Sequence, residues 1–255
     1  MVPQNFESST APILDSITKI SQQKNMLESL FKIEKDYLGV MTRNTLKLLN
    51  ADIEVLEQDS EIYNLIETYI KNTSVQGFKL NVIEIFKVQR HEEVERYAPF
   101  KNFTNRQLLL HGSRIENFAS IIRNGLKISN RKNLFGHGIY FADIASKSAN
   151  YCKNDQGIGI LALCEVALGN IFELDGFRGL NHLPSNFDSV KALGKFHPDI
   201  AQTHTTDDGV LIPLGEVNVG YNRNVFNKML LYNEYIVYNE SQIKLKYLVK
   251  FKNNS

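Results

Sequence analysis

One acidic side chain, Glu234, lies in a stretch of sequence that otherwise alternates like a half-buried β-strand. On such a strand Glu234 shares a face with Leu230, Tyr232, Ile236 and Tyr238. A carboxylate in an apolar row is rarely fully buried without a partner. Two interpretations therefore stand at this point. Base rates favour a solvent-facing strand residue, and the alternative is an acid held in a functional site.

Two other stretches contain side chains that suit ligand binding. The first is His111, Gly112 and Ser113, which follow an apolar run at residues 108–110. The second stretch spans residues 138–151, reads GIYFADIASKSANY, and supplies Tyr140, Lys147, Ser148 and Tyr151. Each candidate also has an ordinary structural interpretation, such as a core histidine, a turn glycine, a core tyrosine or a solvated helix lysine.

Several common catalytic and metal-binding motifs are missing from the sequence. It contains no Gly-x-Gly-x-x-Gly turn, no Walker A loop and no Gly-x-Ser-x-Gly elbow. The six histidines form no His-x-x-x-His or His-Glu-x-x-His pair, and the two cysteines form no Cys-x-x-Cys. These absences argue against a zinc site, against the usual dinucleotide-binding turn and against a disulfide-dense scaffold.

The 255-residue chain has an ordinary globular composition, with 43% hydrophobic and 22% charged residues. Lys and Arg number 29 against 28 Asp and Glu, so the formal net charge is only +1. We therefore expect no dominant electrostatic attraction to nucleic acid or to a membrane. No apolar run approaches the roughly 18 residues of a membrane span, and the start of the chain lacks a signal-peptide pattern. These features predict an intracellular soluble protein.

Helical periodicity precedes the strand-like segments. Residues 1–11 are polar and are predicted to be flexible. Isoleucines at a spacing of three and four residues begin a pattern that predicts two short amphipathic helices within residues 12–49. A further helix is predicted to start near Asp59 or Ser60, because either side chain can cap it.

Beyond residue 77 the pattern changes to short strands. An alternation that starts at Phe78 and loses its phase at Ile83 predicts a long strand with a bulge. Few long helices separate the strand candidates, which favours a mixed or antiparallel α+β fold over a doubly wound parallel sheet. Residues 172–208 have little periodicity and are predicted to be a long loop. The other strand candidates are residues 107–111, 138–141, 159–167, 210–213, 232–238 and 244–250, and the helix candidates are 115–124 and 143–151.

These stretches stand in an order and spacing that occur in one known family. Between residues 50 and 252 the sequence contains HGSR, GIYFAD, SKSANYC, EVALGN, GVLIPLG and NEYIVY. With these motifs it resembles the catalytic domain of the poly(ADP-ribose) polymerases, the diphtheria-toxin-like ADP-ribosyltransferases. The resemblance implies an antiparallel or mixed two-sheet core over residues 50–255. Residues 12–49 resemble the last part of the helical regulatory domain that precedes this core in the DNA-damage-responsive members.

The resemblance implies a site that cleaves the bond between nicotinamide and ribose in NAD. Gly112 and Ser148 match the residues that bind the nicotinamide carboxamide, the glycine through its backbone. Tyr140 and Tyr151 match the two rings that flank the nicotinamide, whose positive charge suits an aromatic neighbour. The transition state of this reaction resembles an oxocarbenium ion, so the site must stabilise positive charge on the sugar.

Other residues match positions around the two ribose rings. Glu234 matches the acid at the nicotinamide-side ribose, and Lys147 resembles a lysine beside that acid. His111 matches a histidine that binds the adenine-side ribose, and Ser113 matches a further adenosine contact. The set of His111, Tyr140 and Glu234 accompanies chain elongation in this family, so we favour an NAD-dependent poly-ADP-ribosyltransferase. Mono-transfer, NAD hydrolysis and a non-catalytic NAD-binding or ADP-ribose-binding module stay open as alternatives.

The resemblance also implies partners and a location. NAD is the expected co-substrate, and protein acceptors, including the chain itself, are the expected partners. No direct DNA binding and no membrane association are expected from this chain. A nuclear location and a role in the DNA damage response follow from the resemblance alone.

The sequence departs from the family pattern beside the expected donor site. The segment at residues 128–135 is several residues shorter than in the best-known members. Lys127 stands where those members have Arg, and Asn239 followed by Glu240 stands where they begin with an acid. Contacts on this side of the site therefore need not follow the family.

Overall fold

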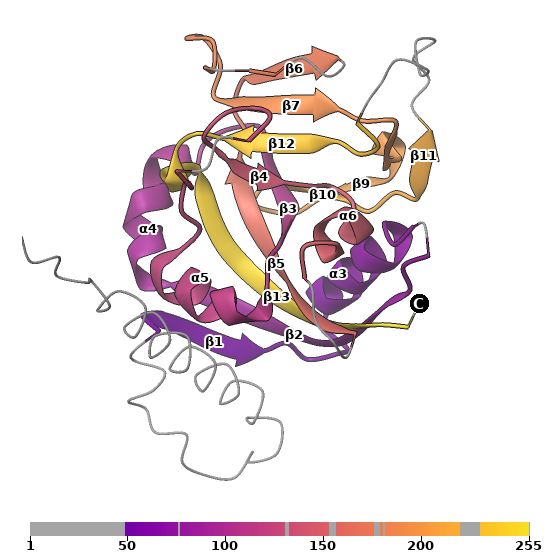
Figure 1. Ribbon diagram of the computed structural model, residues 1–255. Coiled ribbons are helices and arrows are strands. Elements are labelled where there is room, and N and C mark those ends of the chain that lie inside the picture. Colours follow the sequence, from indigo (N-terminus) through magenta and orange to yellow (C-terminus); the bar gives the residue numbers. More distant parts are fainter. Residues whose placement is uncertain are drawn as a thin grey trace, which may run out of the picture.

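Two β-sheets, a two-stranded ribbon and several short helices form the part of the chain that the structure describes (Figure 1). This computed structural model describes residues 49–75, 77–130, 133–152, 157–175, 179–180, 182–219 and 230–254. The mixed α+β class with two sheets, predicted from the sequence, is confirmed. The helices predicted within residues 12–49 lie outside the described residues.

Seven strands form the larger sheet. In spatial order they are β1 (Ala51–Val55), β2 (Leu80–Arg90), β13 (Ile243–Asn253), β5 (Ile158–Ala167), β3 (Arg106–Gly112), β10 (Val210–Pro213) and β9 (Thr203–Thr205). Neighbouring strands pair antiparallel except β10 and β3, which are parallel. The long strand β5 lies in the middle of the sheet, which explains why its sequence is largely apolar on both faces.

A smaller sheet carries Glu234. In spatial order its strands are β4 (Ile139–Phe141), β12 (Glu234–Val237), β7 (Ser189–Leu193) and β6 (Ile171–Asp175), which are stacked at the top of Figure 1. Leu110 and Ala142 exchange two backbone hydrogen bonds of 2.9 Å. These bonds join the end of β3 to the residue that follows β4, so the two sheets meet where the candidate residues lie. A separate ribbon pairs β8 (Phe196–Pro198) with β11 (Val217–Val219).

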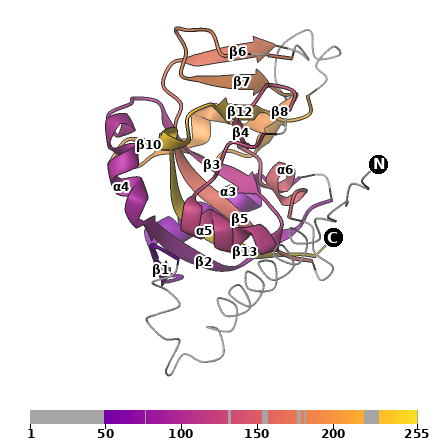
Figure 2. The ribbon, with the colours of Figure 1, turned by 60° about the vertical axis from the view of Figure 1, so that its left-hand side comes forward.

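Short helices cover both faces of the larger sheet. They are α3 (Glu61–Asn72), α4 (His91–Tyr97), α5 (Phe118–Asn124) and α6 (Ala145–Ala149), with 3-10 turns at Ala98–Phe100, Ile115–Asn117, Ile200–Gln202 and Glu240–Gln242. α3 and α5 lie on opposite sides of β13 and β5 (Figures 1 and 2). Strand β3 therefore buries Leu109 in the core beneath α5, and Leu108 and Leu110 in the core beneath α3. None of the described helices is both long enough and apolar enough to cross a membrane.

The helix predicted after residue 59 is confirmed as α3. Ser60 provides its cap, because the Ser60 side chain accepts a hydrogen bond of 3.4 Å from the backbone N–H of Tyr63. Four residues on one face of α3 are buried, at the spacing that the sequence predicts. They are Tyr63, Ile66, Tyr69 and Ile70.

The predicted bulge is present in β2. Lys250 and Phe251 are consecutive on β13, yet they pair with Glu84 and Val82 on β2, so Ile83 is the extra residue. An extra residue shifts the side-chain alternation by one position. This shift is the physical reason why the apolar pattern of the sequence loses its phase at this point.

The prediction of a long loop over residues 172–208 is wrong. The region contains most of β6, all of β7 and β8, and β9. These strands are only three to five residues long, and β7 pairs with β12 from the far end of the chain. Such short strands are stabilised by their partners rather than by a local pattern, so periodicity does not reveal them. Strand β1 and helix α4 were also not predicted, for the same reason of length.

A buried ion pair connects β2, α4, α5 and β13. Arg90 donates to Glu93 at 2.5 Å and to the carbonyl oxygens of Ile122 at 2.6 Å and Arg123 at 2.8 Å near the end of α5. The second carboxylate oxygen of Glu93 accepts from the backbone N–H of Leu245 at 2.8 Å. Both charged side chains are almost completely buried, so each neutralises a charge that would otherwise be buried, with Arg96 as a second, longer partner of Glu93 at 3.2 Å.

Replacing Arg90 should therefore destabilise the protein strongly. We expect Arg90→Ala to lower the free energy of unfolding by about 3–5 kcal/mol, because it leaves Glu93 buried without its main partner. Lys87→Ala is the control, since Lys87 pairs with Glu54 at 4.0 Å on the exposed surface and should contribute at most about 1 kcal/mol. Chemical denaturation measures both values, and similar losses in the two variants would contradict this interpretation.

Candidate active site

A cavity of about 430 Å³, here called the front cavity, lies where the ends of β3 and β4 meet β12 and α6. It collects residues that are far apart in the sequence. Ser113 is the one candidate outside its lining, and its hydroxyl accepts a hydrogen bond of 2.9 Å from Asn117 on the exposed side of the turn. The candidates that line the cavity are His111, Gly112, Tyr140, Lys147, Ser148, Tyr151 and Glu234.

Strand pairing explains why Glu234 lies close to α6. β12 is antiparallel to β4, and Tyr235 pairs with Phe141 at the last residue of β4. Glu234 therefore lies at the end of β4 from which the chain continues into α6. The register of one short strand pair thus places the acid opposite Lys147.

Glu234 and Lys147 are in direct contact through Oε1 and Nζ. Their side chains are only 15% and 18% exposed, so the pair is largely shielded from solvent. Neither ordinary interpretation holds in this geometry, because the glutamate does not face bulk solvent and the lysine is not fully solvated. The contact holds the carboxylate at the wall of the front cavity.

Tyr140 contributes a ring to the cavity and uses its hydroxyl elsewhere. The hydroxyl accepts a hydrogen bond from the backbone N–H of Phe135 and donates one to the carbonyl of Gly136, both at 3.0 Å. Burial raises the pKa of Tyr140 to about 12, and the nearby charge of Glu234 adds to the rise. Tyr140 is therefore a neutral phenol that also fixes the segment leading into β4.

Tyr151 differs from an ordinary core tyrosine because it is 58% exposed. It lines the front cavity just beyond the end of α6. A large aromatic ring that is left exposed beside a cavity is available to stack on a ligand. With Tyr140, it gives the cavity two aromatic groups on different parts of the chain.

His111 is held by one ring nitrogen and presents the other. Its Nδ1 lies 2.8 Å from the carbonyl oxygen of Tyr140, and a carbonyl only accepts, so Nδ1 carries the proton. Burial lowers the pKa of His111 below its ordinary value of about 6.5, so the ring is neutral at pH 7. In this tautomer Nε2 is an acceptor, which suits a bond from a ligand hydroxyl.

Gly112 and Ser148 are packed against each other. A Cβ atom at Gly112 would overlap the carbonyl oxygen of Ser148, so only glycine allows α6 to approach the end of β3 so closely. The Ser148 hydroxyl donates to the carbonyl of Leu110 at 3.2 Å and retains lone pairs that can accept a hydrogen bond.

The segment after α5, which the resemblance places beside the expected donor site, forms a wall of the front cavity. Lys127 and Leu134 are among the residues that line this side. Lys127 pairs with Glu240 at 2.7 Å, and the other carboxylate oxygen of Glu240 accepts from the backbone N–H of Ile128 at 2.9 Å. The two departures from the family pattern, Lys127 and Glu240, are thus partners of each other.

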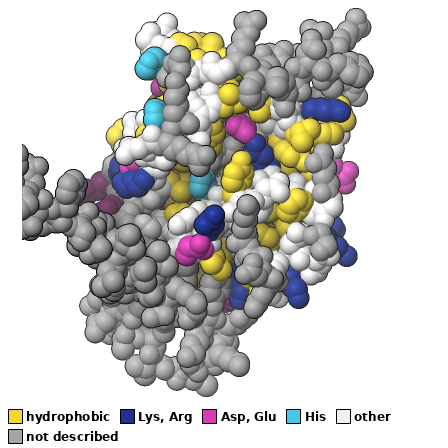
Figure 3. All heavy atoms as spheres, in the orientation of Figure 1, with side chains coloured by type: hydrophobic (Ala, Val, Ile, Leu, Met, Phe, Trp, Pro, Cys, Tyr) yellow, Lys and Arg dark blue, Asp and Glu magenta, His cyan; other side chains and the backbone are white. Residues whose placement is uncertain are grey.

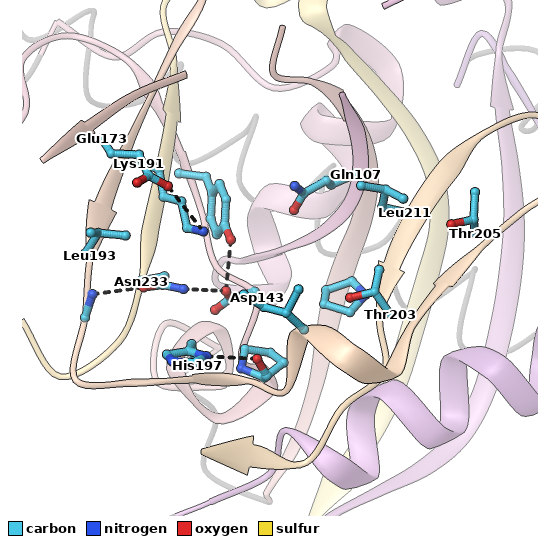
Figure 4. A pocket seen from close by; sticks show the side chains of 15 residues that line it. Gln107, Asp143, Glu173, Lys191, Leu193, His197, Thr203, Thr205, Leu211 and Asn233 are labelled. Carbon is cyan, nitrogen blue, oxygen red and sulfur yellow. Dashed lines mark hydrogen bonds and ion pairs between the residues drawn. The ribbon is translucent and has the colours of Figure 1, made fainter. Parts of the chain in front are cut away.

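A larger cavity of about 590 Å³, here called the back cavity, lies on the other side of β12 (Figure 4). None of the candidate residues lines it, so its size alone does not make it the active site. Asp143 and Asn233 are hydrogen-bonded to each other within it. Neither residue was a candidate predicted from the sequence, although strand alternation at Glu234 indicates that its neighbours face the opposite side.

The chain matches the family model described as "Poly(ADP-ribose) polymerase catalytic domain" over residues 60–253. It is 42% identical to Poly [ADP-ribose] polymerase 1 of Gallus gallus over 274 aligned residues, which cover 100% of this chain and 27% of the relative. It is 38% identical to Poly [ADP-ribose] polymerase 2-B of Oryza sativa subsp. japonica, covering 98% of this chain and 44% of the relative. The chain therefore spans less than half the length of either relative.

The close contact at Gly112 predicts that an added side chain would disturb the packing of α6 against β3. We expect Gly112→Ala to lower the free energy of unfolding by about 1–3 kcal/mol, because the added methyl group forces α6 away from β3. Ser113→Ala is the matched neighbour and should change stability by at most about 0.5 kcal/mol. Chemical denaturation of both variants provides the measurement. Equal stability of Gly112→Ala and the unmodified protein would show that the contact is not tight.

Proposed function

The chain belongs to the poly(ADP-ribose) polymerase catalytic domain family, and on this basis we propose that it is an NAD-dependent poly-ADP-ribosyltransferase. It would cleave the nicotinamide–ribose bond of NAD and add ADP-ribose units to protein acceptors, including itself. The observation that carries the proposal is the shielded contact between Glu234 and Lys147 in a cavity that also holds Tyr140 and Tyr151.

The arrangement of the front cavity suits NAD as a substrate. Gly112 and Ser148 would bind the carboxamide of the nicotinamide, and the close approach at Gly112 leaves its backbone next to the cavity. Tyr140 and Tyr151 would flank the cationic ring. Nε2 of His111 would accept a hydrogen bond from a ribose hydroxyl on the adenosine side.

Glu234 is proposed to act on the sugar whose bond breaks. The bond between the nicotinamide nitrogen and C1′ of the ribose breaks, and nicotinamide leaves with the electron pair. An acceptor hydroxyl oxygen forms the new bond to C1′, and its proton passes to water. Positive charge develops on the ribose, and a carboxylate shielded from water stabilises it by a few kcal/mol, on the order of 10²–10³ in rate.

Polymer formation is favoured over single transfer by the combined placement of His111, Tyr140 and Glu234 in the front cavity. The family resemblance associates this set with chain elongation. In a non-catalytic binding module the acid would have no such use. Mono-transfer and NAD hydrolysis are distinguishable outcomes of the experiment below.

Domain organisation, partners and location are proposed on the resemblance. Residues 50–255 would form the catalytic domain, and residues 12–49 part of a helical regulatory segment. Acidic, basic and hydrophobic side chains are interspersed on the face shown in Figure 3, and the net charge is +1. This mixed distribution supports the proposal that this chain does not bind DNA directly, and NAD and protein acceptors are proposed as partners on the resemblance. A nuclear location is part of the same proposal.

Removing the charge of Glu234 should stop the reaction. We expect Glu234→Gln to lower transfer of labelled ADP-ribose by about 10²–10³-fold, because the amide cannot stabilise positive charge on the ribose. Incubation with labelled NAD followed by a gel separates the outcomes. A high-mass smear indicates polymer formation, and a single shifted band indicates mono-transfer. Label released as soluble ADP-ribose indicates hydrolysis, and NAD that stays unchanged indicates binding without catalysis. Glu92→Gln, on the exposed surface of α4, is the control and should retain activity. Near-normal transfer by Glu234→Gln would overturn the assignment.

Tyr151 should act mainly in substrate binding. We expect Tyr151→Ala to raise the KM for NAD about tenfold with a smaller effect on kcat, since a stacking ring contributes about 1–2 kcal/mol. Tyr151→Phe keeps the ring and should behave like the unmodified protein. Steady-state kinetics over a range of NAD concentrations make the comparison, and an unchanged KM in Tyr151→Ala would remove the stacking role.

A further inference from the structure

Strand β12 presents Glu234 to the front cavity and its two neighbours to the other side. Asn233 and Tyr235 both line the back cavity, as the alternation of a β-strand requires. Both are almost fully buried, with exposures of 4% and 3%. The position of Glu234 therefore depends on what holds these two residues from behind.

Asn233 is bound through both ends of its side-chain amide. Its oxygen accepts from the backbone N–H of Gly194 at 2.9 Å, and its nitrogen donates to Oδ2 of Asp143 at 2.8 Å (Figure 4). A Cβ atom at Gly194 would overlap the backbone of Tyr232, so the chain packs tightly at this point. The residue immediately before Glu234 is thus fixed by partners from two distant segments.

Tyr235 is bound to the same carboxylate oxygen. Its hydroxyl donates to Oδ2 of Asp143 at 3.0 Å. One buried oxygen atom therefore accepts hydrogen bonds from the residues on both sides of Glu234. These two bonds limit rotation and translation of the strand at the intervening residue.

Asp143 is itself fixed to the segment that carries Lys147. It follows Ala142, whose backbone is bonded to Leu110, and it precedes α6 by two residues. The first residue of α6, Ala145, donates its N–H to the hydroxyl of Thr73 on the C-cap of α3 at 3.0 Å. Asp143 thus links the strand that bears Glu234 to the helix that bears Lys147.

Burying the carboxylate of Asp143 costs free energy, which its contacts must offset. Asp143 is 2% exposed, and burial raises the pKa of its carboxyl, while the hydrogen bonds from Asn233 and Tyr235 and the charge of Lys191 act in the opposite direction. An apolar side chain would fill the same space without this cost. It would not define the position of both neighbours of Glu234.

We propose that Asp143 is a positioning residue, which orients Glu234 toward Lys147 and the reacting sugar by binding Asn233 and Tyr235 from the back of β12. The inference rests on the proposed function of Glu234. It adds a buried carboxylate, outside the front cavity, to the groups on which transfer depends.

The kinetic test compares variants that remove or keep the acceptor oxygen. Asp143→Ala should lower kcat by about 10²-fold, because a misplaced catalytic group loses about this much, and should change the KM for NAD less than threefold. Asp143→Asn should recover most of the rate, since an amide oxygen can accept both bonds. Thr205→Ala, which lines the same cavity without contacting Asp143, is the control. Equal rates for Asp143→Ala and Asp143→Asn would overturn the proposal, as would a rise in KM at constant kcat.

A second comparison tests whether the effect passes through Glu234. In a Glu234→Gln background, Asp143→Ala should lower the residual rate no further, because the group that it positions has already lost its charge. An additional 10²-fold loss would overturn the inference and leave the role of Glu234 intact. If Glu234→Gln alone retains activity, the proposed function fails instead, so the two failures are distinguishable.

Tyr235→Phe is a smaller change that tests the same hydrogen bond to Asp143 in case Asp143→Ala does not fold. It removes one hydroxyl group and keeps the ring in the core, so the protein should melt within a few degrees of the unmodified protein. We expect kcat to fall about three- to tenfold, in keeping with the loss of one hydrogen bond. An unchanged kcat in folded Tyr235→Phe, together with an unchanged kcat in folded Asp143→Asn and Asp143→Ala, would show that Asp143 has only a structural role.

Discussion

The alternation of side chains along β12 is the constraint on which the site depends. It sends Glu234 to the front cavity, where Lys147 contacts it, and sends Asn233 and Tyr235 to the back, where Asp143 accepts from both. A shift of one residue in strand pairing would exchange the two sides and place the acid in the wrong cavity. The pairing of β12 with β4 and β7 therefore determines chemistry as well as architecture.

The segment between β4 and α6 couples the two sheets to each other. Ala142 bonds to β3, Asp143 bonds to β12, and Lys147 reaches Glu234 within one turn of α6. The packing at Gly112 brings the same helix against the end of β3. The front cavity is thus bounded by groups whose positions are mutually dependent. His111 and Tyr140 are neutral, so its charged lining groups are Glu234, Lys147 and Lys127.

Much of the fold could be predicted from local pattern. A cap at Asp59 or Ser60, the apolar face of α3 and a bulge near Ile83 were all predicted, because each depends on neighbours within a few residues. The strands β6 to β9 were not visible within residues 172–208. They are short and obtain their hydrogen bonds from segments distant in the chain, so no local period marks them.

For the site, the sequence by itself determined which residues were candidates, through motifs whose order and spacing match a family. It did not determine how they interact, and on residue type alone Glu234 was better explained as a solvent-facing strand residue. The resemblance already placed Lys147 beside Glu234, but only the tertiary structure showed their direct contact, paired Lys127 with Glu240, and revealed Asp143 behind β12. The physical reason is that these contacts join residues 87 to 113 positions apart, and strand register, which the chain sets only on folding, decides which of them meet.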